Sequence, residues 1–501
     1  MLGFLSDGFA FALRPDNLFY CFIGCLWGTI VGVLPGLGSL AGLTLLLPVT
    51  YYIEPGSAII MLAGIFYGAM YGGSITSILL KMPGEAASVI TCIDGHEMAR
   101  QGRAGPALVV SAVGSFIGGT VSVVGLMLFA PLVARLMLDV GPASEFLLMV
   151  FALIMMSMIS SGSILKTLMM IMLGLLLSAV GMDQITAHPR FTFGSINLLD
   201  GVSFVAMALG LFGISEILLN LEKIASIKPI VPTFRSLIPQ GSDIRESAMP
   251  IARGSVIGFV MGAIPGISHV ISTFLSYSVE KRLSRHPEKF GHGAIAGVAG
   301  PETANNATTG SSMIPLTVLG IPAIPATAIL LSALMIHGIQ PGPELISKHP
   351  EVFWGLVASM YVGNAILLVL NLPLVGLFVY LLRIPYAYLA PSVLMVCFIG
   401  IYAVNASTFD LYIMVGFGML GYLLRKLDFD MAPLLLAVVL GERIEVSLRR
   451  ALIIADGDYM QLFTSQASQV ITALFLAIFA IQLLSWRRAA RNARKAEQAS
   501  G

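Results

Sequence analysis

The sequence predicts an all-α polytopic membrane protein with about 11–12 transmembrane helices, since each bilayer-spanning helix needs roughly 20 mostly apolar residues. Three observations support this fold class: an apolar composition, a succession of long apolar stretches, and a pattern that occurs twice. The 501 residues are 57% hydrophobic and 11% charged, with a mean hydropathy of +0.89. Soluble proteins carry about 25% charged residues. So few charged side chains could not keep a water-facing surface solvated, and we expect the surface to face lipid.

The remaining composition excludes several classes of protein. The net charge is +1, and no basic stripe with interleaved aromatic residues indicates nucleic-acid binding. The four cysteines form no CxxC pair or Cys/His cluster, which argues against a disulfide framework or a zinc site. The N-terminus lacks the pattern of a cleaved signal peptide. We therefore expect it to be retained, with residues 1–13 forming a short interfacial helix.

The apolar stretches fall into two sets separated by a polar connector. The first set lies near residues 18–53, 57–80, 107–138, 144–160, 164–180 and 202–219. The second set lies near residues 254–279, 295–320, 321–339, 352–382, 386–404, 411–424, 431–440 and 470–486. The expected division is an N-terminal transmembrane repeat (1–221), a cytoplasmic connector (222–253), a C-terminal transmembrane repeat (254–486) and a basic cytoplasmic tail (487–501).

Two stretches have the wrong length for simple spans. Residues 18–53 would form a straight helix of about 54 Å at 1.5 Å per residue, whereas the hydrocarbon core is about 30 Å thick. The run Pro35-Gly36-Leu37-Gly38 lies near its middle, and we expect the helix to break there. Residues 431–440 are too short to span the membrane, so they are expected to be re-entrant or part of a bent helix.

Lys and Arg in short flanking loops indicate orientation. The tail and the connector are both basic and are expected in the cytoplasm. Residues 254–279 are flanked by basic residues on both sides, from Arg253 before to Lys281 after. A single span would place one cluster on the wrong face. We therefore predict a re-entrant hairpin that turns at Pro265-Gly266.

The internal repeat is the strongest pattern in the sequence. Gly28-xxx-Gly32-xx-Pro35-Gly36 recurs as Gly258-xxx-Gly262-xx-Pro265-Gly266, at an offset of 230 residues (from 28 to 258). A lone GxxxG is common in membrane helices, where it lets helices pack closely, but matches in register across two halves indicate a duplication. Further matches pair Gly73-Ser74 with Gly310-Ser311, Gly105-Pro106 with Gly342-Pro343, Met172-Leu173-Gly174 with Met419-Leu420-Gly421, and Asp183 with Asp430.

Repeated halves with broken helices at corresponding places are typical of secondary transporters, commonly as inverted repeats. A broken helix frees N–H and C=O groups that lipid cannot satisfy, so breaks persist only inside protein or beside a water-filled cavity. The freed helix N-termini suit an anionic substrate. A channel is the first alternative, but channels usually show symmetric filter elements in an oligomer. The motifs HExxH and GxSxG are absent, so no enzyme is expected.

Two polar segments lie inside apolar regions: residues 300–312 and, in the first half, residues 67–85. Their hydroxyls, amides and exposed N–H groups suit carboxylates, and their hydroxyl, amide and carbonyl oxygens suit sodium; the alternative is ordinary interhelical hydrogen bonding. The candidate substrate-binding residues are Gly36, Gly38, Gly73, Ser74, Thr76, Lys81, Pro83, Gly84, Gly266, Ser268, His269, Asn305, Asn306, Thr309, Gly310, Ser311 and Pro322. The candidate sodium ligands are Ser74, Thr76, Asn305, Asn306, Thr308 and Ser312.

Ionisable residues at membrane depth are costly and therefore point to function. Glu302 and Lys81 are the candidates, although Lys81 could equally snorkel to the interface from a helix end. His269 could be a proton-sensitive ligand, and the alternative is a structural hydrogen bond. Glu145 and Glu216 lie near the ends of spans and are expected to be interfacial.

Several motifs resemble the large permease subunit of the tripartite tricarboxylate transporters, over nearly the whole chain. The motifs are Gly28 to Gly38, Tyr71-Gly72-Gly73-Ser74-Ile75-Thr76, Pro83-Gly84-Glu85, Asp94-Gly95 to Ala104-Gly105-Pro106, Ser276-Tyr277-Ser278-Val279-Glu280-Lys281-Arg282, Pro301-Glu302-Thr303-Ala304-Asn305-Asn306 and Leu319-Gly320-Ile321-Pro322.

The resemblance implies a multi-pass secondary transporter in the bacterial inner membrane. It implies import of citrate-like di- or tricarboxylates coupled to a sodium or proton gradient, with no other cofactor. It also implies two partners, a small membrane subunit and a periplasmic solute-binding protein that delivers the substrate. The alternative function is a channel or carrier for a different small organic anion.

The sequence departs from the family pattern beside the proposed site. Ile267-Ser268-His269 follows the second Pro-Gly pair, where the family has small residues, and Ala323-Ile324-Pro325 follows Pro322, where Gly-Ser is expected. Lys81 stands where Asn is common. These changes bear on which carboxylate is bound rather than on the permease assignment.

Overall fold

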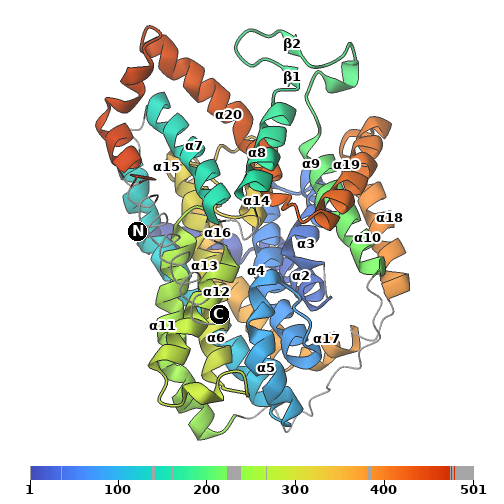
Figure 1. The fold of residues 1–501 in the computed structure, drawn as a ribbon, viewed down its shortest axis with the longest axis vertical. Helices are drawn as coiled ribbons and strands as arrows, with labels where there is room; N and C mark the ends of the chain where they lie inside the picture. Colours follow the sequence, from blue (N-terminus) through green and yellow to red (C-terminus); the bar gives the residue numbers. More distant parts are fainter. Residues whose placement is uncertain are drawn as a thin grey trace, which may run out of the picture.

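The computed structural model describes residues 2–34, 37–137, 141–159, 163–222, 239–266, 268–381 and 386–473, with the isolated positions 475, 476 and 479. Helices dominate this part of the chain, and two short antiparallel strands, β1 (Gly181–Met182) and β2 (Pro189–Arg190), pair within one loop (Figure 1). The longer helices of the first half are α1 (Leu2–Ala12), α2 (Pro15–Val33), α3 (Gly38–Leu46), α4 (Pro55–Leu80), α5 (Thr91–Arg100), α6 (Ala104–Met137), α7 (Pro142–Ile159), α8 (Ile164–Ser178), α9 (Phe204–Ala208) and α10 (Ser215–Glu222).

The second half has the same helical character. Its helices are α11 (Gly241–Ala263), α12 (His269–Leu283), α13 (Ala296–Ser311), α14 (Pro325–Ile336), α15 (Pro343–Lys348), α16 (Pro350–Asn371), α17 (Val375–Leu381), α18 (Tyr386–Asn405), α19 (Thr408–Lys426) and α20 (Ala432–Ile454). The described residues also form short helical turns: η1 (Pro48–Tyr52), η2 (Ala86–Val89), η3 (Ile196–Leu198), η4 (Leu209–Ile214), η6 (Pro287–Lys289), η7 (Pro315–Leu319) and η8 (Tyr459–Phe463).

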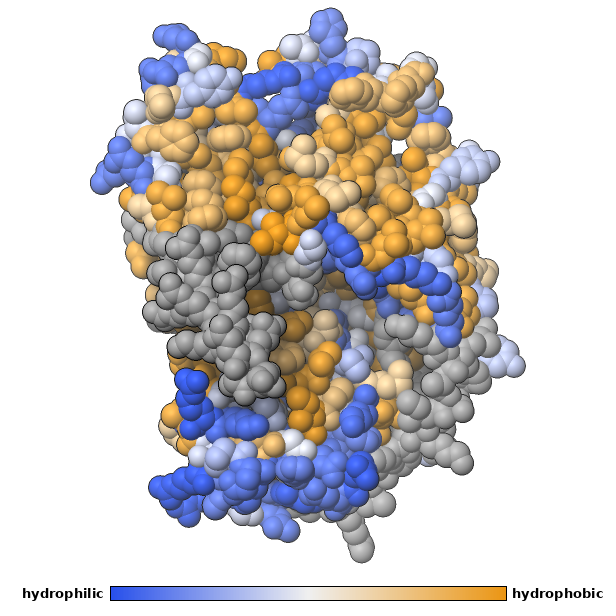
Figure 2. Space-filling view, in the orientation of Figure 1, coloured by the Kyte–Doolittle hydropathy of each residue, from blue (hydrophilic) through white to orange (hydrophobic). Residues whose placement is uncertain are grey.

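In the described part of the chain, 5 helices are long and apolar enough to cross a membrane: Pro15–Val33, Pro55–Leu80, Ala104–Ala134, Phe204–Glu222 and Pro350–Asn371. Shorter apolar helices accompany them, among them α8 and α14. Figure 2 shows hydrophilic residues gathered at the upper and lower ends of the molecule, with hydrophobic residues over much of the surface between them. The predicted fold class, an all-α polytopic membrane protein, is confirmed.

Several predicted elements take a definite form. The stretch 18–53 breaks as expected, because α2 ends at Val33 and α3 begins at Gly38. Residues 431–440 are the start of α20, which continues through charged residues to Ile454. The expected N-terminal helix exists as α1, and its Phe4 ring stacks on Trp354 of α16 with ring centroids 6.2 Å apart.

The helices α2 and α4 pack closely because glycines line their contact. A Cβ added at Gly28 would lie 2.3 Å from the carbonyl oxygen of Ile65, and one added at Gly32 would lie 2.3 Å from that of Ala69. No real Cβ approaches an atom that closely, so only glycine permits this spacing. Both residue numbers rise together along the contact, which means that α2 and α4 run parallel.

The second half repeats this packing between α11 and α13. A Cβ at Gly258 would lie 2.3 Å from the carbonyl oxygen of Ala304, and one at Gly262 would lie 2.4 Å from that of Thr308. The first helices match at an offset of 230 residues (from 28 to 258), and the second helices at 239 (from 65 to 304). The GxxxG pattern read from the sequence therefore marks the same helix contact twice. The domain boundaries predicted from it stay a prediction, and α11 begins within the predicted connector.

The two packing units run in opposite directions. Ser74 near the end of α4 contacts Glu302 near the start of α13. Phe66, earlier in α4, packs on His269 with ring centroids 5.8 Å apart, and His269 contacts Thr309 further along α13. The order is reversed between the two helices, so α4 and α13 are antiparallel. Equivalent helices thus have opposite orientations, which is the arrangement of inverted repeats.

A hairpin joins α11 to α12, as the flanking basic residues predicted. The chain turns at Gly266, which has a φ of +87° that favours glycine. The Arg253 side chain on α11 donates to Glu280 near the end of α12, with a Nε to Oε1 distance of 2.7 Å. The two ends of the hairpin therefore lie side by side, at the lower end of the molecule in Figure 1.

Candidate functional site

The first helix break is closed by a carboxylate of the chain itself. The loop that follows α4 folds back toward the start of α3, where the backbone N–H of Ser39 donates to Glu85. Gly84 fits this loop against α2, because a Cβ there would lie 2.0 Å from the carbonyl oxygen of Gly32. A helix N-terminus carries a partial positive charge. Glu85 therefore supplies the anion that the broken helix attracts.

At the second break, the loop after α13 takes the position that the loop after α4 has at the first, but it carries no carboxylate. The backbone N–H of Gly266 donates to the carbonyl oxygen of Ala323 at 2.9 Å, which ties the break to the loop after α13. His269, the first residue of α12, is buried, and its Nε2 lies 3.0 Å from the Thr309 hydroxyl. The Phe66 ring packs edge-on against the imidazole. His269 is thus held in place by one polar and one aromatic contact.

The loops at the two breaks are equivalent residue by residue, at the offset of 239. Lys81 and Gly320, which begin the two loops, both have left-handed backbones, with φ of +60° and +65°. The backbone N–H groups of Glu85 and Ile324 each donate to a hydroxyl three residues further on, that of Ser88 and that of Thr327 respectively. Pro83 and Pro322 also correspond. The sequence repeat therefore extends through both loops.

A buried polar stripe on α13 connects the two breaks. Glu302, Asn305 and Thr309 follow the i, i+3, i+7 spacing of one helix face, and each is at most 1% exposed. Glu302 accepts hydrogen bonds from the hydroxyls of Ser74 and Thr91. Among the described residues, Glu302 makes no ion pair. A buried carboxylate held by two hydroxyls suits a proton or a small cation.

Asn305 lies between these two contacts along the stripe. Neither its side-chain oxygen nor its side-chain nitrogen has a hydrogen-bond partner, and the residue is fully buried. The backbone carbonyl of Asn305 accepts from Thr309 at 2.9 Å. An unpaired buried amide costs free energy, about 1–3 kcal/mol, so the Asn305 side chain is a candidate to bind a polar ligand.

The other predicted site residues on α13 point to different neighbours. The side chain of Asn306 donates to Ser115 of α6 at 2.7 Å. The Thr308 hydroxyl lies 2.7 Å from Ser272 and 3.1 Å from the carbonyl oxygen of Gly258. Ser311 also contacts Gly258, and Ser312 donates to the carbonyl oxygen of Thr309 at 2.7 Å. The candidate sodium ligands on α13 therefore contact different neighbouring helices, and Ser74 and Thr76 lie on α4.

The predicted residues near α4 also separate into groups. Gly73 borders the Glu85 loop, and Thr76 donates to the carbonyl oxygen of Gly73 at 3.1 Å. Lys81 is exposed and ends α4 in a left-handed conformation, the geometry that suits Asn or Gly best among residue types. This position at the end of a helix is the alternative that the sequence left open for Lys81, and its role as a ligand stays a prediction. Gly36 lies outside the described residues.

A small cavity of about 10 Å³ lies beside the stripe, enough for about one water molecule. The Tyr67 hydroxyl is buried there without a partner, while Tyr71 donates to Asn364 at 2.5 Å. Asn306 and Gly310 line the same cavity from α13. These groups extend the polar interior from α4 across to α16.

Two contacts of the site were not predicted from the sequence. Thr91, which binds Glu302, follows a loop of ordinary composition and carries no signal of its own. Asp94, one turn later, is fully buried and accepts from the backbone N–H groups of Gly291, Gly293 and Ala294 and from Tyr277. The Asp94-Gly95 motif was the available signal for it. Asp94 fixes the loop before α13 and so positions the stripe.

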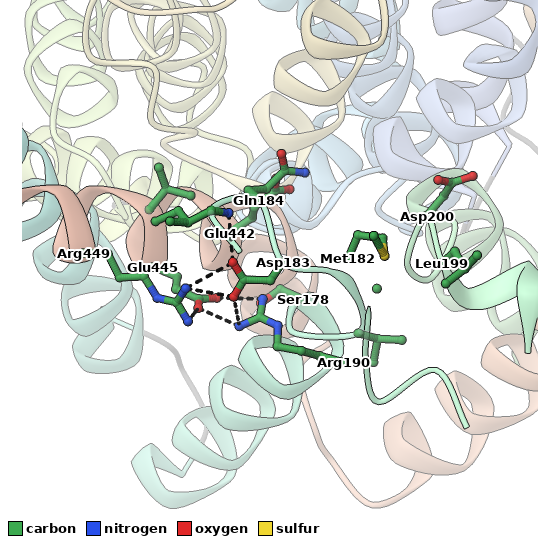
Figure 3. Close-up of a pocket in the computed structure, with 14 residues that line it drawn as sticks. Ser178, Met182, Asp183, Gln184, Arg190, Leu199, Asp200, Glu442, Glu445 and Arg449 are labelled. Atoms are coloured by element: carbon green, nitrogen blue, oxygen red, sulfur yellow. Dashed lines mark hydrogen bonds and ion pairs between the residues drawn. The ribbon is translucent and has the colours of Figure 1, made fainter. Parts of the chain in front are cut away.

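A second polar cluster lies near β1, β2 and α20, at the upper end of the molecule in Figure 1, and Figure 3 shows it in close-up. Asp183 and Arg190, from the loop after α8, form ion pairs with Glu445 and Arg449 of α20. The two shortest join Arg190 Nη1 and Arg449 Nη2 to Glu445 Oε1, each at 2.6 Å. They border a cavity of about 200 Å³. Every charge in this cluster is paired within it, which marks it as a structural link between the loop and α20.

We predict that Asp183→Asn loosens this loop. The N–H groups of Thr186 and Ile185, together with Arg449, hold the pKa of Asp183 well below its usual range. A carboxyl whose pKa is lowered by folding stabilises the loop fully above its ordinary pKa of about 4, and the stabilisation is lost as pH falls through the lowered value. Limited proteolysis at neutral pH should cut residues 184–200 faster in this variant than in Asp200→Asn. Equal rates would contradict the assignment.

Comparison with known proteins identifies the family of this chain. The model of the tripartite tricarboxylate transporter TctA family matches residues 18–436. The chain belongs to this family. The match spans both broken helices, both loops and the α13 stripe. TctA proteins are transporter subunits of tripartite systems, so this chain is a membrane transport protein and not an enzyme.

Two relatives of this TctA protein come from Agrobacterium vitis. An uncharacterized 52.8 kDa protein in the TAR-I ttuC' 3' region is 47% identical over 488 residues, covering 97% of both chains. An uncharacterized protein in the TAR-II ttuC' 3' region is 47% identical over 235 residues, which is 47% of this chain and 97% of the relative. No solved structure matches the TctA chain.

Proposed function

We propose that this chain is the substrate-conducting permease of a tripartite system that imports di- or tricarboxylates across the bacterial inner membrane. The observation that carries the proposal is the buried stripe Glu302–Asn305–Thr309, which runs between two helix breaks in inverted repeats. The first break contacts α4 at Gly73, through the Glu85 loop, and the second contacts it at Phe66, through His269. These two positions on α4 lie about 10 Å apart at 1.5 Å per residue. Secondary transporters bind substrate and coupling ion at such places.

Electrostatics supports an anionic substrate and a cationic coupling ion. Helix N-termini at the breaks favour carboxylates, while Glu302 favours a proton or sodium. We place the coupling ion at Glu302 with the hydroxyls of Ser74 and Thr91. Coupling follows if the ion must neutralise Glu302 before a carboxylate can bind nearby, because two unscreened negative charges at this depth repel strongly.

The proposed topology puts the lower end of Figure 1 in the cytoplasm. The helix α5, which ends at Arg100, lies at this end, and the end of α12, with Lys281 and Arg282 in its last turn, contacts α5 through Tyr277 and Asp94. The positive-inside rule favours the cytoplasm for such basic residues. The opposite end would then face the periplasmic solute-binding protein that delivers the substrate, and the small membrane subunit would complete the complex.

The substrate class is tested by competition. Proteoliposomes that contain this permease with the small subunit and the binding protein should take up labelled citrate, and an excess of unlabelled di- or tricarboxylates should compete. A monocarboxylate such as acetate should compete weakly, since it offers one charge. Competition by acetate as strong as by citrate would favour the alternative, a carrier for a different small organic anion.

A further inference from the structure

Among the described residues, a carboxylate contacts the helix start at one of the two breaks of the inverted repeat, and the residue that carries it is Glu85. Glu85 has an extended backbone with φ −130° and ψ 151°, and its counterpart Ile324 has φ −146° and ψ 164°. A helical turn begins directly after each residue, and a proline, Pro83 or Pro322, lies two residues before it. The backbone N–H of each residue donates to a hydroxyl three residues further on. The two residues therefore have similar backbone conformations, but Glu85 carries a carboxylate and Ile324 an apolar side chain.

The donors that face these two side chains also correspond. Ser39, whose N–H donates to Glu85, matches His269 at the offset of 230. A Cβ added at Gly38 would lie 3.5 Å from the Glu85 carboxylate, so the carboxylate is seated at the first turn of α3. Among the described residues, no side chain accepts a hydrogen bond from the first turn of α12. The start of α12 therefore lacks the anion that the start of α3 has.

A second, independent observation points to a ligand at this end. Asn305 is fully buried with both polar atoms of its side chain unpaired. It lies one turn before Thr309, whose hydroxyl contacts His269 at the start of α12. Its face of α13 is the one that meets α4 and α12. An exogenous carboxylate at the start of α12 would have the helix N-terminus and the Asn305 amide as its hydrogen-bond donors.

We propose that the start of α12 binds one carboxylate group of the transported substrate, in the place that Glu85 fills at the start of α3. This inference rests on the proposed function and specifies its binding site. In the first repeat Glu85 takes the place of such a carboxylate group, whereas the corresponding residue of the second repeat is the apolar Ile324. His269, Thr309 and Asn305 would be the neighbours of the bound carboxylate group at the start of α12.

The test introduces the missing carboxylate. In Ile324→Glu, the new carboxylate should occupy the start of α12 in place of the substrate. Citrate binding should weaken by at least about tenfold, because two like charges repel each other at one site. Ile324→Gln has the same size without the charge and should bind citrate within about threefold of the unchanged protein. Binding is measured by calorimetry on the purified full-length permease, with citrate as the probe.

The outcomes separate the inference from the proposed function. If the unchanged permease binds citrate and Ile324→Glu binds it equally well, the inference is wrong while the carboxylate function stands. If the unchanged permease binds neither citrate nor succinate, the proposed function fails and the inference with it. Equal weakening by Glu and Gln would mean that size rather than charge is responsible, which also overturns the inference.

A labelling experiment covers the case in which Ile324→Glu does not fold. Ser268 immediately precedes α12 and is partly exposed, and the native cysteines are all buried. In Ser268→Cys, citrate should slow maleimide labelling, whereas in Ser284→Cys at the far end of α12 it should not. Labelling of Ser268→Cys that is unaffected by saturating citrate would overturn the proposal.

Discussion

Replacing Glu302 by glutamine is expected to reduce gradient-driven uptake at least tenfold while the protein still folds. Glutamine keeps the size of the side chain and can accept from the hydroxyls of Ser74 and Thr91, but it carries no charge to balance a sodium ion and no site for a transferred proton. A tenfold change corresponds to about 1.4 kcal/mol. Uptake in proteoliposomes with and without a sodium or pH gradient measures the effect.

The control for this variant is Glu288→Gln. Glu288 lies in η6 with a side chain that is 69% exposed, so the same chemical change is made far from the stripe and should leave uptake unchanged. If Glu302→Gln retains full uptake with an intact dependence on the gradient, Glu302 is a structural residue and the coupling site lies elsewhere.

The second large effect is expected from Gly258→Ala. The added methyl group would lie 2.3 Å from the carbonyl oxygen of Ala304 and 2.7 Å from the Cβ of Ala307. Both neighbours are residues of α13, and neither a backbone oxygen nor a Cβ can turn aside, so α11 and α13 must move apart. Such overpacking costs about 1–3 kcal/mol. The melting temperature of the purified protein in detergent should fall clearly.

The matched control is Gly416→Ala in α19, where an added Cβ meets nothing within 4 Å. Alanine is the better helix former by about 1 kcal/mol, so this variant should melt at the same temperature or higher. Gly28→Ala, the counterpart in the first repeat, should behave like Gly258→Ala. A tolerated Gly258→Ala would show that the helix contact is looser than described.

The fold could be predicted largely from local signals. Pro35-Gly36 and Pro265-Gly266 mark the breaks because proline and glycine act on the backbone directly, whatever surrounds them. The GxxxG pairs mark the close contacts for the same reason. The opposite orientation of the repeats required the structure, since it depends on which way each helix crosses the membrane and not on any residue type.

The candidate site was less predictable than the fold, because the rotation of α13 about its own axis decides which side chains face the two breaks. Residues 300–312 are small and polar on all sides, so their composition does not reveal which of them share a face. Asn305 and Asn306 are adjacent in sequence, yet Asn306 binds Ser115 on α6 and Asn305 faces the region between the breaks. For Lys81 the sequence left two interpretations open, a ligand or a lysine at a helix end; the structure places it, exposed, at the end of α4, and its role in binding stays a prediction.

The central claim is that this permease moves carboxylates by coupling them to an ion gradient. Its most direct test is the concentration of labelled citrate inside proteoliposomes that carry the complete complex, followed over time under an imposed sodium or proton gradient. The account predicts accumulation above the external concentration, which an ionophore abolishes. Equilibration to the external concentration with no response to either gradient would contradict it and would indicate a channel.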